Sequence, residues 1–459
     1  MRIVRDTAGG NAQAVPPIYK KSIRNIPMNH TFFSCILLIS CMTAVPAAAQ
    51  QTMTVDDAVA TAVDNNISIQ RNRITVEGYR RADAHSWNSI SPSLNLSADY
   101  RKPTAPTDPI TTDYTTSLGA SVSLTFSPSL FTSMKTARLN YEKGLISFEQ
   151  ACRSVELSVR SSFYAILYET ENLSLQKRNL ETARQQYETN RAKYNAGRIP
   201  QLDVLTAQVT YEKLKPAVES AEITLQNDMN TFKQLLGLDL AADLALSGSL
   251  DDILALDTVV LDQDIDQLVQ NSSSVQLLVK QLQAAETAVT AFRFSAYGPT
   301  ATASWAYDKS TVHPKNGSAV TTDTGSLKLG VSIPLDGVLP WSSKSDNVTS
   351  AKDAVQDLKL QLQDQKTAVK VSIQNYLRQI QQAQSTIKSL QANISLAKQS
   401  YEMTQEAYSH GTKDLLSLQT SSDALLQAQV SLKSEAYTLI KAILNLEDIT
   451  GSAFGTLGK

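Results

Sequence analysis

Few side chains in this 459-residue sequence have the types and spacing of a catalytic or metal-binding site. Neither a glycine-rich phosphate loop nor a G-x-S-x-G nucleophile motif occurs. Asp56 and Asp57 lie near a predicted helix start, where acidic side chains complement the helix dipole. The four histidines are scattered without the spacing of metal ligands, at His30, His85, His313 and His410. The sequence therefore predicts a protein that is not an enzyme and binds no cofactor or metal.

The polar residues that do follow a pattern alternate with apolar residues. In "SLGASVSLTF" (117–126), serine, glycine and threonine fall on one face of a strand and apolar side chains on the other. Three further runs alternate in the same way: "PSLNLSADY" (92–100), "PTATASWAY" (299–307) and "SLKLGVSIPL" (326–335). Each run has the length of a tilted strand that crosses a bilayer, about nine to eleven residues. Hydroxyl-rich faces with few charges are typical of a water-filled lumen, so the sequence predicts four membrane strands.

Four such strands cannot close a barrel, because about eight is the practical minimum. An open sheet edge in lipid would leave backbone groups unpaired at a high free-energy cost. If the strands span a membrane, several chains must therefore share one barrel. The alternative is a soluble sheet packed on helices, and it is disfavoured because the long helices already use their apolar residues in their own seams.

The chain also repeats itself at an offset of 214 residues. The matched pairs are Tyr187 with Tyr401, Tyr194 with Tyr408, Gly197 with Gly411, Leu202 with Leu416, and Gly237 with Gly451. Apolar residues recur every seven positions on both sides of Gly197 and Gly411, the pattern of two helices in an antiparallel coiled coil. Glycine allows the chain to leave each helix in a left-handed conformation. The first helix is predicted from about Ser133 to Asn195, roughly 90 Å at 1.5 Å per residue.

These patterns predict a mainly α-helical chain with four membrane strands and an internal two-fold repeat. Each repeat is predicted to contain a helix, a strand pair and a long helical hairpin. The predicted parts are a signal peptide at 1–49, repeat 1 at 53–237, a linker at 238–262, repeat 2 at 263–451 and a C-terminal tail at 452–459.

The amino-terminal residues have the parts of a secretory signal peptide. A basic segment precedes the apolar run "TFFSCILLISCMTAV" and the small-residue site "PAAAQ", which predicts cleavage after Ala49. "LISC" (38–41) resembles a lipobox, so lipidation at Cys41 is the alternative, and Met28 is a second candidate start. Removal of residues 1–49 takes away five basic residues and one acidic residue, which changes the net charge from −2 to −6. A mildly acidic exported chain is not suited to binding nucleic acid.

The sequence resembles the TolC-like outer-membrane efflux proteins, the outer membrane factors of tripartite efflux and type I secretion systems. The resemblance covers essentially all of residues 53–451. Its most specific carriers are the two turn motifs "YNAGRIPQLDVLTAQ" (194–208) and "YSHGTKDLLSLQTSS" (408–422). The opening "MTVDDAVATAVDNN" (53–66) and "FKQLLGL" (232–238) support it.

The resemblance implies a homotrimer in which four strands from each chain form a twelve-stranded β-barrel in outer-membrane lipid. The helices would continue it as an α-barrel through the periplasm, with segment 238–262 in a belt around the middle. The implied function is a passive exit duct, gated at its periplasmic tip. The implied partners are a periplasmic adaptor protein and an inner-membrane transporter that supplies cargo and energy.

The resemblance also assigns roles to residues at the two turns. Family members carry acidic gate residues six and nine positions after the second turn glycine, where this chain has Ser417 and Thr420. We hypothesise that Asp414 moves the acidic ring one turn toward the entrance, and the alternative is that Asp414 only caps the following helix. Asp203, the first-repeat counterpart of Ser417, is a helix-start acid or a pore residue.

Two further sets of tip residues follow from the resemblance. Tyr408 and Lys413 match the tyrosine and the basic residue of the family's latch between coiled coils. The turns match the place where adaptor hairpins are expected to dock, at Gly197, Arg198, Gly411 and Thr412.

A secreted coiled-coil scaffold or adhesin without a pore is the competing function, since heptads alone do not separate it from a duct. The four lipid-length strands, placed alike in both repeats, favour the duct. A duct dedicated to heavy-metal export is a third hypothesis, for which the sequence offers no Met or His cluster.

Overall fold

The structure of the protein is a computed structural model that describes residues 51–104, 112–251 and 264–457. The predicted signal peptide with Cys41, linker residues 252–262 and the last two residues of the predicted tail lie outside the described residues.

The first half of the chain forms a short strand, two helices, a β-hairpin and a long helical hairpin. Its elements are β1 (Gln51–Met53), α2 (Val55–Asn65), α3 (Ile67–Ala84), η1 (Ser86–Ile90), β2 (Ser93–Arg101), β3 (Thr112–Phe126), α4 (Ser129–Asn195), α5 (Gln201–Leu236) and β4 (Leu244–Leu246).

The second half repeats this order. Its elements are α7 (Ile265–Asn271), α8 (Ser273–Tyr297), β5 (Thr300–Pro314), β6 (Val320–Ser332), η2 (Asp336–Val338), α9 (Ser343–Ser409) and α10 (Leu415–Thr450). Helices α4 and α9 have 67 residues each, and α5 and α10 have 36 each. Every bound of α9 and α10 lies 214 residues after the matching bound of α4 and α5, which confirms the internal two-fold repeat.

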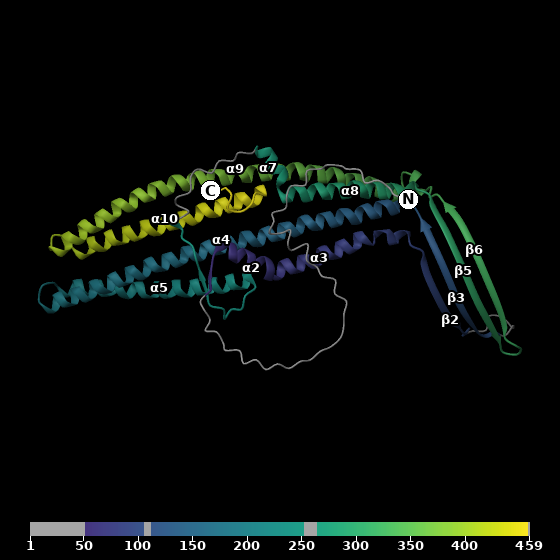
Figure 1. The fold of residues 1–459 in the computed structure, drawn as a ribbon, viewed down its shortest axis with the longest axis horizontal. Coiled ribbons are helices and arrows are strands. Elements are labelled where there is room, and N and C mark those ends of the chain that lie inside the picture. Colours follow the sequence, from purple (N-terminus) through teal and green to yellow (C-terminus); the bar gives the residue numbers. More distant parts are fainter. Residues whose placement is uncertain (1–50, 105–111, 252–263, 458–459) are drawn as a thin grey trace.

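The helices form a layer that is four helices wide along the whole helical part of the molecule (Figure 1). On the half remote from the sheet, α5, α4, α10 and α9 lie side by side in that order. On the half next to the sheet, α3 and α8 pack on the continuing helices α4 and α9. The core runs along these seams, and Phe163 of α4 meets Phe232 of α5 with ring centroids 6.3 Å apart.

The helix expected at the start of each repeat is in fact two helices. Asn66 ends α2 and caps α3, because its side-chain oxygen accepts hydrogen bonds from the backbone N–H groups of Ser68 and Ile69. Ser272 occupies the matching break between α7 and α8. Met53, the first residue of the predicted repeat 1, belongs to β1, which pairs in parallel with β4 of the linker.

The four longer strands form one antiparallel sheet in the order β2-β3-β5-β6 (Figure 1). Strands β3 and β5 have 15 residues each, more than the runs that predicted them, and the additional residues at the far end are mostly polar. The expected extension of the last strand to Leu335 is wrong for a single chain, since β6 ends at Ser332. Pro334, which has no N–H to donate to a ladder, lies two residues further on.

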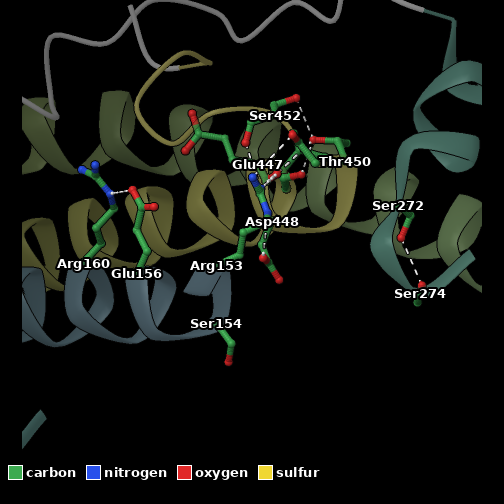
Figure 2. A network of polar contacts seen from close by, with 12 residues as sticks. Arg153, Ser154, Glu156, Arg160, Ser272, Ser274, Glu447, Asp448, Thr450 and Ser452 are labelled. Carbon is green, nitrogen blue, oxygen red and sulfur yellow. Dashed lines mark hydrogen bonds and ion pairs between the residues drawn. The ribbon is translucent and has the colours of Figure 1, made fainter. Parts of the chain in front are cut away.

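The predicted tail is a docked segment (Figure 2). The fully buried carboxylate of Glu447 accepts hydrogen bonds from the backbone N–H groups of Gly455, Thr456 and Leu457 at 2.8–3.0 Å. Arg153 of α4 donates from Nη2 to the carbonyl oxygens of Glu447 and Ser452, both at 2.8 Å. The end of the second repeat is thereby fastened to the long helix of the first.

Candidate functional site

The sheet has one apolar face that no other part of the described chain covers. The register sets Leu94, Val122, Trp305 and Leu327 in one row across all four strands. The side chains of Leu96 and Leu329 are 82% and 76% exposed. Such a face on an outer-membrane strand is suited to contact lipid.

Aromatic residues lie at both ends of this apolar face. At the far end, Tyr114 stacks on His313 with ring centroids 4.2 Å apart and lies 5.4 Å from Tyr100. At the end next to the helices, Phe126 meets Phe131 at 6.0 Å. Aromatic side chains at two levels are typical of the two membrane interfaces of a β-barrel.

The opposite face of the sheet is polar. One row contains Ser93, Ser123, Ser304 and Lys328, and a parallel row contains Ser97, Gly119, Asp308 and Thr324. Hydroxyl groups and isolated charges on one face, with apolar residues on the other, are the arrangement of a barrel strand between lumen and lipid.

Both helical turns at the tip have the same backbone geometry. Gly197 and Gly411 have φ angles of 70° and 74°, the left-handed conformation that the sequence predicts. The N–H of Arg198 donates to the carbonyl of Lys193, and that of Thr412 donates to Ala407, both at 2.9 Å. These bonds define two Schellman caps, and both turn glycines are exposed.

Tyr408 connects the two helical hairpins close to the tip. Its hydroxyl donates a 2.9 Å hydrogen bond to Oδ1 of Asn190 on α4, and its ring lies 5.1 Å from Nζ of Lys193. Burial raises the pKa of Tyr408, and the nearby carboxylate of Asp203 raises it further. Of the two predicted latch residues, Tyr408 therefore joins the hairpins, whereas Lys413 lies exposed beside Asp414.

Asp414 is the N-cap of α10. Its carboxylate accepts a 2.9 Å hydrogen bond from the backbone N–H of Ser417. Hydrogen bonds from Ser417 lower the pKa of Asp414, so this exposed group is ionised at neutral pH. The hydroxyl of Thr420 donates to the carbonyl of Leu416, and Asp203 lies in the first turn of α5.

Two contact residues of Tyr408 were not expected from the sequence, Asn190 and Lys193, and neither was Gln186, which donates a hydrogen bond to Asn190. Asn190 has no exposed surface, and its Nδ2 has no hydrogen-bond partner. The sequence does contain a signal for this contact. Asn190 lies three residues after Tyr187, at a heptad position that is normally apolar, so a polar residue there is unusual.

A second unexpected feature lies midway along the first hairpin. The carboxyl group of Glu169 on α4 lies near that of Asp228 on α5, and burial together with this neighbouring acid raises the pKa of Glu169 to about 7. The counterparts in the second hairpin are the buried residues Ala383 and Ala442. The first hairpin therefore contains two neighbouring carboxyl groups at positions where the second hairpin has alanine.

The part of the chain that the structure describes contains no cluster of three or more His, Cys, Asp or Glu side chains placed to hold a metal ion. None of the helices in the described residues has the length and hydrophobicity needed to cross a membrane.

The chain is similar in fold to three solved outer-membrane proteins. The Campylobacter jejuni CmeC outer membrane channel matches with a TM-score of 0.69 and 16% identity, over 86% of this chain and 85% of that chain. The Vibrio cholerae outer membrane protein VceC matches with a TM-score of 0.69 and 14% identity, over 87% and 96%. The open state of the Neisseria gonorrhoeae MtrE outer membrane channel matches with a TM-score of 0.68 and 17% identity, over 87% and 89%.

A comparison with curated protein sequences gives no match. The profile of the outer membrane efflux protein family, however, matches residues 58–238 and 265–452, both repeats almost in full. The chain is therefore a member of the outer membrane efflux protein family, a TolC-like channel protein of the outer membrane with its helical part in the periplasm, and not an enzyme.

Proposed function

We propose that this protein is the passive exit duct of a tripartite efflux or type I secretion system, gated at its periplasmic tip. The observation that carries the proposal is the four-stranded sheet, which has one apolar face, one polar face and two unpaired edges. Only closure with other chains gives such a sheet a stable place in lipid.

Three copies of the chain supply the number of elements that a continuous duct needs. Four strands per chain make twelve, enough to close a barrel with a water-filled lumen. The layer of four helices per chain likewise makes a ring of twelve along the whole periplasmic length. Proteins of this family are trimers in general, which supports the same number here.

We propose that the belt around the middle of the tunnel includes linker 238–262. Its described part supports this position, since Leu250 is fully buried against the helices. Nζ of Lys433 on α10 lies 2.6 Å from Oδ1 of Asp251 and 2.7 Å from Oε2 of Glu171 on α4. Residues 1–49 are proposed as the signal peptide, with Cys41 as the alternative lipidation site.

The proposed partners are a periplasmic adaptor protein and an inner-membrane transporter, with which proteins of this family work in general. We assign adaptor docking to the turns at Gly197, Arg198, Gly411 and Thr412. Leu202 and Leu416, which are 69% and 66% exposed and occupy matching positions after the two turns, offer apolar contact to an adaptor helix.

We assign gating to the contacts at the tip. Tyr408 and Asn190 hold the two hairpins of one chain together. Three copies of Asp414 would set a negative ring at the entrance, one turn before the uncharged positions of Ser417 and Thr420. Carboxylates around a narrow axis raise one another's pKa, but the hydrogen bonds from Ser417 oppose this effect and favour the ionised form.

The deciding experiment is the native mass of the protein extracted in mild detergent from the outer-membrane fraction, followed by conductance in a planar bilayer. The proposal expects a detergent-dependent trimer that conducts ions. A soluble monomer or dimer without conductance would overturn it and favour a scaffold or adhesin.

A further inference from the structure

The outer strands of the sheet, β2 and β6, each have one edge unpaired within the described chain. The proposed trimer, on which this inference rests, requires β6 of one chain to pair with β2 of the next. We propose that this junction has one defined register, with Ser332 opposite Ser97 of the partner subunit.

The internal repeat supplies the first step. "PSLNLSADY" (92–100) matches "PTATASWAY" (299–307), and "SLGASVSLTF" (117–126) matches "SLKLGVSIPL" (326–335), so β2 corresponds to β5 and β3 to β6. The structure tests this correspondence within the two hairpins. Ser93 pairs with Ser123 in the first hairpin, and their counterparts Thr300 and Ser332 pair in the second. The two hairpins therefore share one register.

The junction between the two hairpins supplies the second step. Within the chain, β3 pairs with β5, and Ser123 lies opposite Ser304. The counterpart of β3 is β6, and the counterpart of β5 is β2 of the next chain. The counterpart of Ser123 is Ser332, and that of Ser304 is Ser97. Transfer of the known junction therefore sets Ser332 opposite Ser97 of the partner subunit.

This register joins like faces across the subunit boundary. Val331 would lie opposite Ala98 of the partner subunit, and Leu329 opposite Tyr100 of the partner subunit, so the apolar face continues around the barrel. Ile333, which follows the end of β6 in the single chain, would lie opposite Leu96 of the partner subunit. That leucine side chain is 82% exposed in the isolated chain. Ile333, the first apolar residue beyond β6, thus gains a partner that only a neighbouring chain provides.

A slip of two residues is the strongest competing register, because it keeps the same faces and sets Lys328 opposite Asp99 of the partner subunit. An exposed ion pair of this kind contributes little. In the proposed register, Asp99 of the partner subunit lies opposite Gly330. Because this glycine has no side chain, the aspartate carboxylate has room to approach Lys328 diagonally. The proposed barrel has six junctions between neighbouring hairpins, three within chains and three between chains. The slip would give the three junctions between chains a different stagger from the three within chains, whereas a closed barrel links stagger to strand tilt.

Disulfide trapping tests the register in the full-length protein. The test variant carries Ser97→Cys with Ser332→Cys, and matched controls carry Asn95→Cys with Ser332→Cys and Asp99→Cys with Ser332→Cys. All these positions lie on the polar face, and the native Cys152 is buried. A second test variant, Ala98→Cys with Val331→Cys, lies on the other face, so one of the two pairs has the closer spacing of non-hydrogen-bonded partners.

The native mass of each variant is measured first, and covalent trimer is then followed on a non-reducing gel during mild oxidation. We expect at least one test variant to form covalent trimer about tenfold faster than the controls, because directly opposite Cβ atoms lie within disulfide range and diagonal ones do not. Faster trapping in a control variant would establish a slipped register and overturn the inference. A native trimer that no test variant traps would also overturn it and leave the proposed trimer standing. A monomeric native mass would instead overturn the proposed function.

Discussion

The hydroxyl of Tyr408 at the end of α9 and the amide oxygen of Asn190 on α4 lie 2.9 Å apart and join the two helical hairpins of one chain. In the proposed trimer, the counterparts at the seam between chains are Tyr194 and Thr404, so a neighbouring chain would offer a hydroxyl group where this chain offers an amide. Lys193, which lies over the ring of Tyr408, has Ala407 as its counterpart. We therefore expect the tip contacts within one chain, a hydrogen bond to an amide and a lysine over a tyrosine ring, to be stronger than the corresponding contacts between chains.

Replacement of Tyr408 by phenylalanine should loosen the tip. The variant loses one hydrogen bond to a buried amide, about 1 kcal/mol, which corresponds to roughly a fivefold shift between closed and open states. Single-channel recording should therefore find a higher open probability at an unchanged open conductance. Tyr401→Phe, one heptad earlier on α9, is the matched control, and equal effects from both substitutions would contradict a specific latch.

Asp414 should have two separable effects. Asp414→Asn keeps a capping side chain and removes the charge, so cation selectivity should fall several-fold while the melting temperature falls only slightly. Asp414→Ala removes both the cap and the charge and should lower the melting temperature further. Because the folded-state pKa of Asp414 is lowered, its stabilising effect is present above its ordinary pKa of 3.8 and is lost as the pH falls through the lowered value. Unchanged reversal potentials in both variants would refute the acidic ring.

The Glu169–Asp228 pair should make the first hairpin less stable as the pH rises. The pKa of Glu169 is raised from 4.5 to about 7, chiefly by burial, so the folded chain holds a proton that the unfolded chain releases in this range. The stabilising contribution of the protonated Glu169 carboxyl is present below its pKa in the unfolded chain and is lost as the pH rises through its pKa in the folded chain.

The measurement is the melting temperature of the detergent-solubilised protein between pH 5 and 8. We expect the melting temperature to fall by a few degrees as the pH rises over this range, and Glu169→Gln should remove part of this fall. Glu219→Gln, an exposed position on α5, serves as the control and should leave the fall intact. A fall of the same size in the Glu169→Gln variant would refute the assignment.

Glu447→Gln should release the C-terminal segment. The buried carboxylate accepts three backbone N–H groups, and a neutral amide both weakens these bonds and adds a donor with no acceptor. Hydrogen bonds to a charged group contribute about 1.5–3 kcal/mol, so we expect faster digestion by carboxypeptidase and a lower melting temperature. Glu406→Gln, exposed on α9, is the control, and equal digestion rates in the two variants would show that the carboxylate does not hold the segment.

The sequence by itself determined the repeat, the helical hairpins with their glycine turns, and the four two-faced strands. Each of these depends on a period within one segment, seven residues for a coiled coil and two for a strand, or on the freedom of a single glycine. The offset of 214 residues returns in every bound of the long helices for this reason.

Only the tertiary structure decided which side chains meet across segments. The contact of Tyr408 with Asn190 depends on the axial stagger of two hairpins, and a heptad pattern does not specify it. The pairing of β1 with β4 and the docking of the tail on Glu447 bring together short segments that have no period of their own. The end of β6 at Ser332, short of the apolar run, depends on an edge that one chain leaves unpaired. Local periodicity sets the elements, whereas packing between distant elements, and between chains, sets their contacts and their ends.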